Sequence, residues 1–582
     1  MAQLLDYVTF LVLTGTGLAV GAYFSIHANG QAPRSTHEVF LGSKSLRMLP
    51  LAMSVLATVG SATGIIGLPA HMYAYGWHIG WLSVSNIILI PLGASVVMPV
   101  LYKLNITSVF QYIRMRYDRT IAVITSLTYI MLSQAVGAIA LYASAEAAST
   151  LLNFHVSWCS LAIGLAATAY TSLGGIRGVV WADCLQAMLT ICVPVLIIVK
   201  VATNTTSHLR PLSEMDIRSY LFNITVDFST NENTWAVIIA SSSMFLNRIC
   251  FDQGTVQRYL ASRTLEEAKL TLIVGTLMTC AYYALLTGAA IALTCKYSGC
   301  DPHLLGSIER IDQLIPFFIT QELSGSGISG IFLAGVVSAS ISTVSSMVNS
   351  QAALWYFDII TPLIQVTNKH VGVTLTGTAF AVGVAMTVLS VAIPYAGSAV
   401  TIFIAVNAAI TGPFVGLFLL AITVPFASCK GAGIATLLMV IYQVFHLTYS
   451  IQGGNREQRM PVSLDYCPEN STNTSRSVNI TLITPSQRHG SSLSPLDMST
   501  LWSSFFSTVI TYLGGILASL LIGSKEDHNS NLTSPILVPL WQWLRWMPPK
   551  VPDLSHCVAE TRELTQETQL DEQETPAAET IC

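Results

Sequence analysis

Hydroxyl-bearing residues crowd the segment from Ala334 to Ser350, and they are the side chains of this sequence best suited to chemistry. If the segment is a helix, the residues on or beside one face are Ser338, Ala339, Ser342, Thr343, Ser345, Ser346 and Asn349. Neutral oxygen ligands of this kind bind a hard cation such as sodium weakly and reversibly. The same face can instead join neighbouring helices through hydrogen bonds, and the residues alone leave both interpretations open.

A glycine-rich apolar run that ends at Pro69 predicts a broken helix. Gly60, Gly64 and Gly67 lie within it, and glycine destabilises a helix interior while proline removes a backbone hydrogen bond. In lipid, the freed backbone groups must be satisfied by protein, water or ligand, so a break near Thr58–Gly64 should line a cavity. Its carbonyls can face a cation and its second half can present an N-terminus to an anion. Close packing through small residues is the alternative.

Three adjacent serines, Ser241–Ser243, predict a second break in a short apolar run. They could instead hydrogen-bond back to their own helix. The two breaks fall in the first helices of two five-span blocks, 49–203 and 234–427. Because five is odd, the second block has inverted topology, and paired breaks in inverted halves indicate a transport site.

Asp183, which follows Trp181 at the predicted start of a membrane span, has two interpretations. It can cap the helix start, where a carboxylate is favoured, or it can serve cation exit or gating. The chain lacks HExxH, paired membrane carboxylates and a placed Ser/His/Asp set, so no enzyme class is indicated.

The elements that position these groups must lie in lipid. The chain of 582 residues is 52% hydrophobic and only 10% charged, whereas soluble domains carry roughly 25% charged residues. No Asp, Glu, Lys or Arg occurs from Leu49 to Tyr102, which is long enough for two crossings of about 20 residues each. A net charge of −4 gives no sign of a nucleic-acid partner, and 11 scattered cysteines without a CxxC pair give no sign of a metal or redox site.

Apolar runs of helix length predict an all-α integral membrane protein with about thirteen transmembrane helices. They are 4–25, 49–73, 79–101, 120–149, 155–173, 181–203, 234–252, 271–294, 326–356, 371–394, 399–427, 431–450 and 501–523. An odd number places the termini on opposite sides. With the N-terminus extracellular and the C-terminus cytoplasmic, the cytoplasmic segments hold 18 of the 27 Lys and Arg residues, Arg248 among them, and the short outer loops hold none.

Glycosylation sequons test this orientation independently. Those in the two long outer loops, which we expect to be glycosylated, are Asn204, Asn223, Asn470, Asn473 and Asn479. Asn105 and Asn531 fall on the inner side and should be unused. Any polar linker would also be rich in Asn, Ser and Thr, so the sequons alone do not decide.

The two ends of the chain carry little further signal. The start, Met1–Ser25, lacks a basic n-region and a cleavage site, so it predicts a retained helix. Residues 524–582 end in an acidic, Gln/Thr-rich stretch and predict a disordered cytoplasmic tail. The terminal Thr580–Cys582 loosely resembles a ligand of PDZ domains, although a plain solvated end explains it equally simply.

Several motifs together resemble one family. Besides the hydroxyl-rich run they are Gly174–Gln186 (GGIRGVVWADCLQ), Asp252–Arg263 (DQGTVQRYLASR), Asp312–Pro316 (DQLIP) and Val424–Ala427 (VPFA). The combination resembles the sodium:solute symporter family, and most closely its branch of sodium-coupled monocarboxylate and sodium-dependent multivitamin transporters. The resemblance covers residues 6–522.

The resemblance implies a LeuT-like fold of two inverted five-helix repeats, with one leading helix and two trailing helices. The segments would be a leading helix and cytoplasmic loop at 1–48, repeats at 49–203 and 234–427, an extracellular loop at 204–233, trailing helices in 428–523 around the glycosylated loop 451–500, and the tail 524–582.

The resemblance also implies a sodium site. In the family this site takes two carbonyls from the broken helix, and one carbonyl and two hydroxyls from the hydroxyl-rich helix. The matching positions are Ala57, Gly60, Ala339, Ser342 and Thr343. Gly60 departs from the bulkier residue that is usual there, which makes it the least determined ligand. Ser346 matches a position of a second sodium site in some members.

The implied function is import of a small organic solute, a monocarboxylate or a carboxylate vitamin, across the plasma membrane by sodium-coupled alternating access. Sodium is the coupling ion and no cofactor is expected. A sodium-independent channel or uniporter, or a non-transporting sensor on the same scaffold, is the alternative. The residues expected to line the solute pocket are Thr58, Ser61, Thr63, Gln134, Tyr142, Ser241, Ser243 and Phe245.

A disulfide between Cys300 and Cys467 is expected because both lie in outer loops, where the compartment is oxidising, and because the resembled branch has cysteines at similar loop positions. Cys295 is a rival partner for Cys300.

The predicted spans contain almost no basic residue. Lys200 can snorkel to the outer surface, and Arg248 is expected toward the cytoplasmic end of its span. No arginine is therefore expected beside the solute. Its charge would be met by the N–H groups near Ser61–Gly64, by hydroxyls and by sodium, which favours singly charged or neutral solutes over dicarboxylates and cations.

Overall fold

The computed structural model describes residues 2–28, 36–203, 216–323, 325, 327–363, 371–396, 399–451, 459–465, 467, 495–522 and 532–544. Within this part the chain is almost entirely helical and forms no β-strand. The long helices are α1 (Ala2–Ala28), α3 (Met48–Val59), α4 (Ala62–Tyr75), α8 (Arg119–Leu152), α9 (Val156–Thr203), α13 (Leu265–Tyr297), α15 (Ile328–Leu354), α17 (Val371–Ala392), α18 (Ala399–Thr423), α19 (Cys429–Ile451) and α20 (Thr500–Ile522).

Shorter helical pieces connect or extend these helices. They are α2 (Thr36–Leu41), η1 (Gly42–Lys44), η2 (Trp77–Trp81), α5 (Leu82–Pro91), η3 (Leu92–Val97), α6 (Met98–Lys103), α7 (Val109–Arg116), α10 (Ile217–Leu221), η5 (Ala236–Ala240), α11 (Ser242–Leu246), η6 (Asn247–Phe251), α12 (Gln253–Leu260), η7 (Ile311–Gln313), α14 (Leu314–Glu322), η8 (Trp355–Ile360), α16 (Thr361–Leu363), η10 (Ile393–Ala396), η12 (Pro495–Asp497) and α21 (Val538–Trp543).

The described helices account for every predicted span. Ten are long and apolar enough to cross a membrane, and the bent pair α3 and α4 makes an eleventh. The apolar segment Ala236–Phe251 is shorter, and α9, with 48 residues, contains two predicted spans. Gly175 has a φ of 58°, a conformation that glycine accepts without strain, and it bends α9 between the two. The chain is therefore a multi-pass membrane protein.

Polarity is distributed as lipid requires. Large apolar side chains are exposed on the outer helix faces, as at Met131, Val373 and Leu521. Serine and threonine are fully buried inside, as at Ser342 and Thr343. Lipid tails are as apolar as leucine side chains, so apolar contact alone does not hold membrane helices together. Hydrogen bonds between buried hydroxyls contribute to that association.

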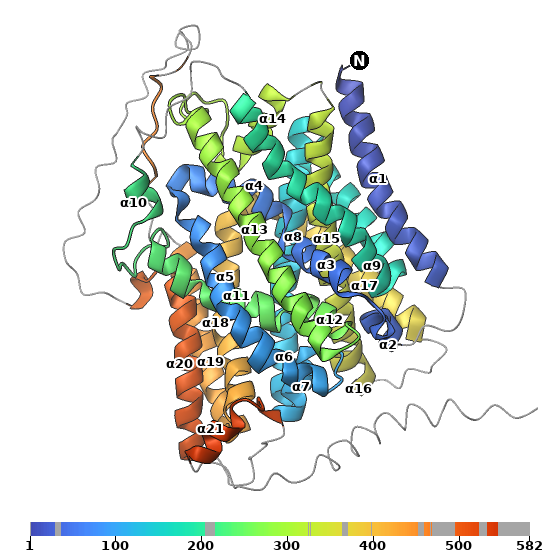
Figure 1. The fold of residues 1–582 in the computed structure, drawn as a ribbon, viewed down its shortest axis with the longest axis vertical. Coiled ribbons are helices and arrows are strands. Elements are labelled where there is room, and N and C mark those ends of the chain that lie inside the picture. Colours follow the sequence, from blue (N-terminus) through green and yellow to red (C-terminus); the bar gives the residue numbers. More distant parts are fainter. Residues whose placement is uncertain are drawn as a thin grey trace, which may run out of the picture.

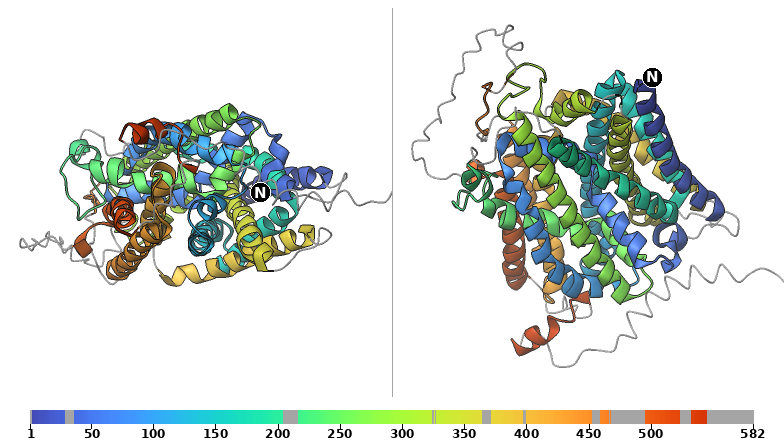
Figure 2. Two further views of the ribbon diagram at one scale, coloured as in Figure 1. Left: turned by 90° about the horizontal axis from the view of Figure 1, so that it is seen from below. Right: turned by 45° about the horizontal axis from the view of Figure 1, so that its top comes forward.

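Helix α15 lies at the centre and packs against α9, α8, α1 and α3, while α13 covers α3 and α4 (Figure 1). Helices α18, α19 and α20 pack together on the side away from α1, as Figure 2 shows from below. Gly335 brings α15 close to α9, since a Cβ there would lie 2.7 Å from the Leu189 carbonyl oxygen. The hydroxyl-rich helix is thus enclosed by protein.

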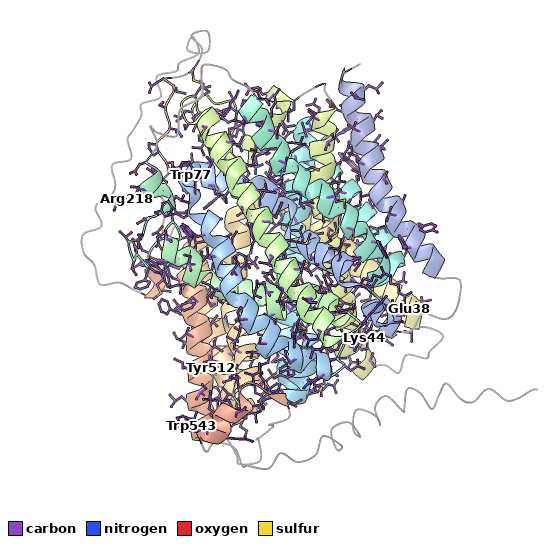
Figure 3. The ribbon with its side chains drawn as sticks, viewed as in Figure 1. Glu38, Lys44, Trp77, Arg218, Tyr512 and Trp543 are labelled. Atoms are coloured by element: carbon purple, nitrogen blue, oxygen red, sulfur yellow. A yellow bond between two sulfur atoms is a disulfide. The ribbon has the colours of Figure 1, made fainter. Side chains whose placement is uncertain are left out.

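The two ends of the described chain lie at opposite ends of the molecule. Figure 1 shows the start of α1 at the top and α21 at the bottom. Figure 3 shows Lys44 and Glu38 low in the same view and Arg218 higher. Lys44 Nζ donates to Asn105 Oδ1 at 2.5 Å, so Asn105 lies with the predicted cytoplasmic loop.

The prediction of a fully disordered tail is wrong for residues 532–544. The Tyr112 hydroxyl donates to the Leu532 carbonyl at 2.9 Å, and the Ser534 N–H donates to the Ile422 carbonyl at 2.8 Å. Trp541 Nε1 donates to the Thr423 carbonyl at 2.7 Å. This stretch, SPILVPLWQW, is apolar enough to dock against the helix ends, whereas the acidic remainder of the tail lies outside the described residues.

Candidate functional site

The predicted break forms between α3 and α4, whose axes differ by 55°. Ser61 caps α4 by accepting a hydrogen bond from the Gly64 N–H at 3.3 Å, and its own N–H donates to the Val59 carbonyl at 3.0 Å. In an unbroken helix these two N–H groups would bond the carbonyls of Gly60 and Ala57. The break diverts the helical donors of both carbonyls, which leaves their oxygens available to a cation.

Helix α15 turns its hydroxyl face toward this break. Thr58 Oγ1, on the last turn of α3, lies 3.0 Å from Ser346 Oγ on α15. All five residues of the sodium set that the family resemblance implies are buried, and they come from these two helices: Ala57, Gly60, Ala339, Ser342 and Thr343.

The two hydroxyls of this set, those of Ser342 and Thr343, donate hydrogen bonds to protein acceptors. Ser342 Oγ donates to Asp183 Oδ1 at 2.6 Å, and Thr343 Oγ1 donates to the Ala339 carbonyl at 2.9 Å. A hydroxyl has one proton and two lone pairs. Both oxygens therefore keep lone pairs with which they can ligate a cation.

A buried ion pair adjoins the hydroxyl face. Asp183 Oδ2 on α9 accepts from Arg258 Nη2 on α12 at 2.9 Å and from Ser54 Oγ on α3 at 2.5 Å. Arg258 also donates to Ser54 Oγ at 2.6 Å and to Ser346 Oγ at 2.5 Å. We call Asp183, Arg258, Ser54, Ser342 and Ser346 the buried network; it joins four helices, and every member is fully buried.

The interpretation of Asp183 as a helix cap is wrong. Helix α9 continues without interruption through Asp183, whose carboxylate meets side chains rather than first-turn N–H groups. Arg258, which balances its charge, stands in a quoted motif (DQGTVQRYLASR), but its role was not predicted. Its neighbours in the sequence are polar, so no local pattern marked this arginine as buried.

A cavity of about 100 Å³ opens beside the break. Its lining comes from α3, α4, η2, α5, η5, α11, η6, α13, α18 and α20: Val59, Gly60, Ser61, Thr63, Gly64, Leu68, Ile79, Leu82, Val237, Ser241, Met244, Phe245, Asn247, Arg248, Tyr282, Tyr283, Asn407 and Leu501. Four predicted pocket residues line it, namely Ser61, Thr63, Ser241 and Phe245.

Four other predicted pocket residues lie elsewhere. Thr58 Oγ1 donates to the Ser54 carbonyl at 2.7 Å and faces Ser346. Ser243 Oγ lies 2.6 Å from Thr508 Oγ1 on α20. Two residues along a helix point to nearly opposite sides, so Ser241 and Ser243 cannot share one cavity.

Gln134 and Tyr142 are both on α8 and do not line this cavity. Gln134 Nε2 donates to Gln351 Oε1 at 3.0 Å. The Tyr142 ring lies 5.9 Å from the Arg310 guanidinium, which pairs with Glu146. Both side chains therefore make their described contacts away from this cavity.

Arg248 lies near the end of its short helical segment, but the expectation that no arginine would stand beside the solute pocket is contradicted by the structure. Arg248 lies in η6, lines the cavity and donates from Nη2 to the Thr58 carbonyl at 3.2 Å. The helical segment formed by η5, α11 and η6 is short. Arg248, near its end, therefore reaches the Thr58 carbonyl beside the break. A cation therefore stands beside the cavity after all.

Three buried polar atoms at the cavity lack a protein hydrogen-bond partner among the described residues. They are Thr63 Oγ1, Asn247 Oδ1 and the Tyr282 hydroxyl. Buried polar groups are normally paired, so their convergence on one cavity indicates a ligand or ordered water there. The remaining walls are mainly aliphatic and aromatic.

On the predicted extracellular side, a disulfide joins Cys300 to Cys467, with Cα atoms 4.9 Å apart, and Cys295 is free. Asn223 lies in the described part of the outer loop, where its Oδ1 accepts from the Thr225 N–H at 3.2 Å. The sequons at Asn204, Asn470, Asn473, Asn479 and Asn531, and the terminal Thr580–Cys582, lie outside the described residues.

A family model, the sodium:solute symporter family, matches residues 39–438. Sodium-coupled monocarboxylate transporter 1 of Mus musculus is 26% identical, over 90% of this chain and 88% of that protein. The sodium/iodide cotransporter of Homo sapiens is 27% identical, over 89% and 82%. The sodium-dependent multivitamin transporter of Oryctolagus cuniculus is 27% identical, over 98% and 90%. These relatives are transporters, not enzymes.

A solved structure of a Na+-coupled sialic acid symporter, in a substrate-bound outward-open state, is similar to this chain with a TM-score of 0.72 at 21% sequence identity. The similarity covers 89% of this chain and 98% of the solved one. It confirms the all-α, LeuT-like fold class.

Proposed function

Because this chain belongs to the sodium:solute symporter family, we propose that it is a sodium-coupled symporter that imports a small monocarboxylate, or a vitamin with one carboxylate, across the plasma membrane. The supporting observation is the cavity at the helix break, where three buried polar atoms have no hydrogen-bond partner among the described residues. The buried hydroxyls of α15 meet the same broken helix at Thr58. The relatives carry monocarboxylates, iodide and vitamins by name. A monocarboxylate suits a mainly apolar cavity that has few polar groups.

Sodium would bind between α3 and α15. Its ligands would be the carbonyls of Ala57, Gly60 and Ala339 and the hydroxyls of Ser342 and Thr343. Neutral oxygen ligands hold sodium weakly enough for release, and a membrane potential adds about 2.3 kcal/mol per charge per 100 mV to its entry. Sodium would stiffen the break, and the break shapes the solute cavity. That shared element couples the two substrates.

The buried network would act as the inner gate. Ser342 belongs both to the sodium set and to the network, since its hydroxyl donates to Asp183. Because the Arg258 guanidinium already lies beside Asp183 and Ser346, we assign these groups to gating and sodium exit rather than to a second sodium site. Opening toward the cytoplasm would separate α3, α9, α12 and α15, as the repeats 49–203 and 234–427 rock against each other.

The test is uptake of labelled solutes into cells or proteoliposomes, with sodium or choline outside. The panel is lactate, short-chain fatty acids, biotin, pantothenate, iodide and a hexose. We expect at least one monocarboxylate to accumulate only with an inward sodium gradient. Uptake that persists unchanged in choline would instead establish the channel or uniporter, and sodium-driven uptake of the hexose alone would reject the solute class.

A further inference from the structure

Among the described residues, Arg248 is a cation that has no acidic partner. It lies in η6, at the end of the short apolar helical segment Ala236–Phe251, and lines the cavity beside the break. Within the described part of the chain it makes one hydrogen bond, from Nη2 to the Thr58 carbonyl at 3.2 Å. No carboxylate of the described residues pairs with it, although its side chain is partly buried.

Arg248 is exceptional in this respect. Other buried or partly buried arginines of the described chain are matched by an acidic side chain or by several carbonyls: Arg258 by Asp183, Arg114 by Asp358, Arg310 by Glu146, and Arg116 by the carbonyls of Ala421, Val424 and Pro425. An unpaired charge at membrane depth is unfavourable and marks a functional site. A mobile anion is the partner that would balance it.

We propose that Arg248 binds the carboxylate of the transported solute; this rests on the proposed function. A guanidinium has five N–H donors, and the contact with Thr58 uses one. Enough donors remain to grip a carboxylate with two parallel hydrogen bonds. The start of α4, with Ser61 and Thr63 at the cavity wall, adds a weak positive end to the same space.

The other residues that line the cavity determine which non-carboxylate portion of a solute fits. Leu68, Ile79, Leu82, Val237 and Phe245 present apolar surface. The described lining contains no acidic side chain and one formal positive charge. This combination selects a single carboxylate on an apolar body. A dicarboxylate would strand its second charge, and an organic cation would be repelled.

The contact with Thr58 ties this anchor to sodium. Thr58 stands between Ala57 and the break, so Arg248 reaches the solute cavity and the sodium half of α3 at once. A solute carboxylate on the guanidinium would hold the arginine in place and, through it, the backbone that carries the Ala57 carbonyl. Removal of Arg248 should therefore weaken solute affinity and sodium affinity together.

The experiment compares carboxylates with their uncharged amides in sodium-driven uptake by the full chain: butyrate and butyramide, lactate and lactamide, nicotinate and nicotinamide. Arg248→Gln should reduce the carboxylate-to-amide ratio by at least about tenfold by raising KM for the carboxylate, since a charged hydrogen-bond partner is lost. Arg248→Lys should keep the carboxylate preference with a several-fold higher KM. The lysine ammonium keeps the positive charge but lacks the paired N–H donors of the guanidinium. Lys269→Gln, which removes a partly exposed cation on α13 outside the cavity lining, is the matched control and should change neither value.

The outcomes separate the two proposals. If the wild type shows sodium-driven uptake and Arg248→Gln has the same carboxylate-to-amide ratio, the role of Arg248 is overturned and the proposed function stands. Absence of sodium-driven uptake of every carboxylate rejects the proposed function as well. If Arg248→Gln fails to reach the cell surface, Arg248→Lys decides, and an unchanged carboxylate KM in that variant overturns the inference.

Discussion

Ser342 belongs both to the proposed sodium set and to the buried network. Its oxygen keeps lone pairs for a cation, while its proton is held by Asp183 at 2.6 Å. Thr343, the next residue of α15, donates its hydroxyl proton to the Ala339 carbonyl of the same helix. The two hydroxyls thus have different second roles, although both belong to the proposed sodium set.

Replacing either hydroxyl should weaken sodium binding. Ser342→Ala and Thr343→Ala each remove one ligand oxygen, which for a charged partner is worth about 1.5–3 kcal/mol. The sodium concentration for half-maximal uptake should rise roughly tenfold or more, at normal surface expression. Ser340→Ala is the control, because Ser340 is buried on the same helix but donates to the Ala140 carbonyl at 3.1 Å. Sodium dependence unchanged in both test variants would refute the assignment.

At the scale of elements, the break between α3 and α4 carries the site. Its two glycines differ in the space around them. A Cβ on Gly60 would lie 3.0 Å from the Leu56 carbonyl oxygen and 3.3 Å from Tyr282 Cε1. A Cβ on Gly64 would have no such contact closer than 3.9 Å.

Because the space around the two glycines differs, alanine substitutions at Gly60 and Gly64 form a matched pair. Gly60→Ala should press on the Tyr282 wall and the last turn of α3, at a cost of about 1–3 kcal/mol, and should raise the sodium and solute concentrations for half-maximal uptake. Gly64→Ala should be tolerated by the fold, with a gain of about 0.4–1 kcal/mol because alanine has fewer unfolded conformations than glycine. Uptake kinetics and thermal unfolding in detergent measure both. Equal effects of the two alanines would contradict this account of the break.

The buried network is the other element-level device, since it ties α3, α9, α12 and α15 together. Asp183→Asn leaves the Arg258 guanidinium buried without its counter-charge, and breaking such a pair costs about 3–5 kcal/mol. Thermal unfolding of the purified protein should shift down by several degrees. Asp183→Asn with Arg258→Met removes both charges and should recover much of the loss. A single variant as stable as the wild type would show that the pair does not hold these helices.

At the scale of the whole molecule, the orientation in the membrane can be tested with the sequons. Asn105 lies with Lys44 at one end, and we place that end in the cytoplasm. Asn223 lies in the loop that we place outside. Asn223→Gln should increase mobility on a gel when the wild type is glycosylated there, whereas Asn105→Gln should leave it unchanged. A glycan on Asn105 would reverse the proposed orientation.

Local sequence patterns predict the class of protein and the outline of the candidate site. Thirteen spans, the break near Gly60 and the hydroxyl face of α15 all follow from patterns within contiguous residues. Hydropathy, glycine content and helical periodicity act locally, because lipid requires each span to satisfy its own backbone. The resemblance carried by GGIRGVVWADCLQ and DQGTVQRYLASR placed the sodium set on the same two helices.

Which charged groups meet became known from the packing of the helices. The pairing of Asp183 with Arg258, the place of Arg248 at the cavity, the turn of Ser243 toward α20 and the docking of residues 532–544 each depend on contacts between distant segments. Such contacts are set by the rotation of each helix about its axis and by where a broken helix stops. Local pattern does not encode either quantity, because a helix face acquires its partner only when the other helices pack against it.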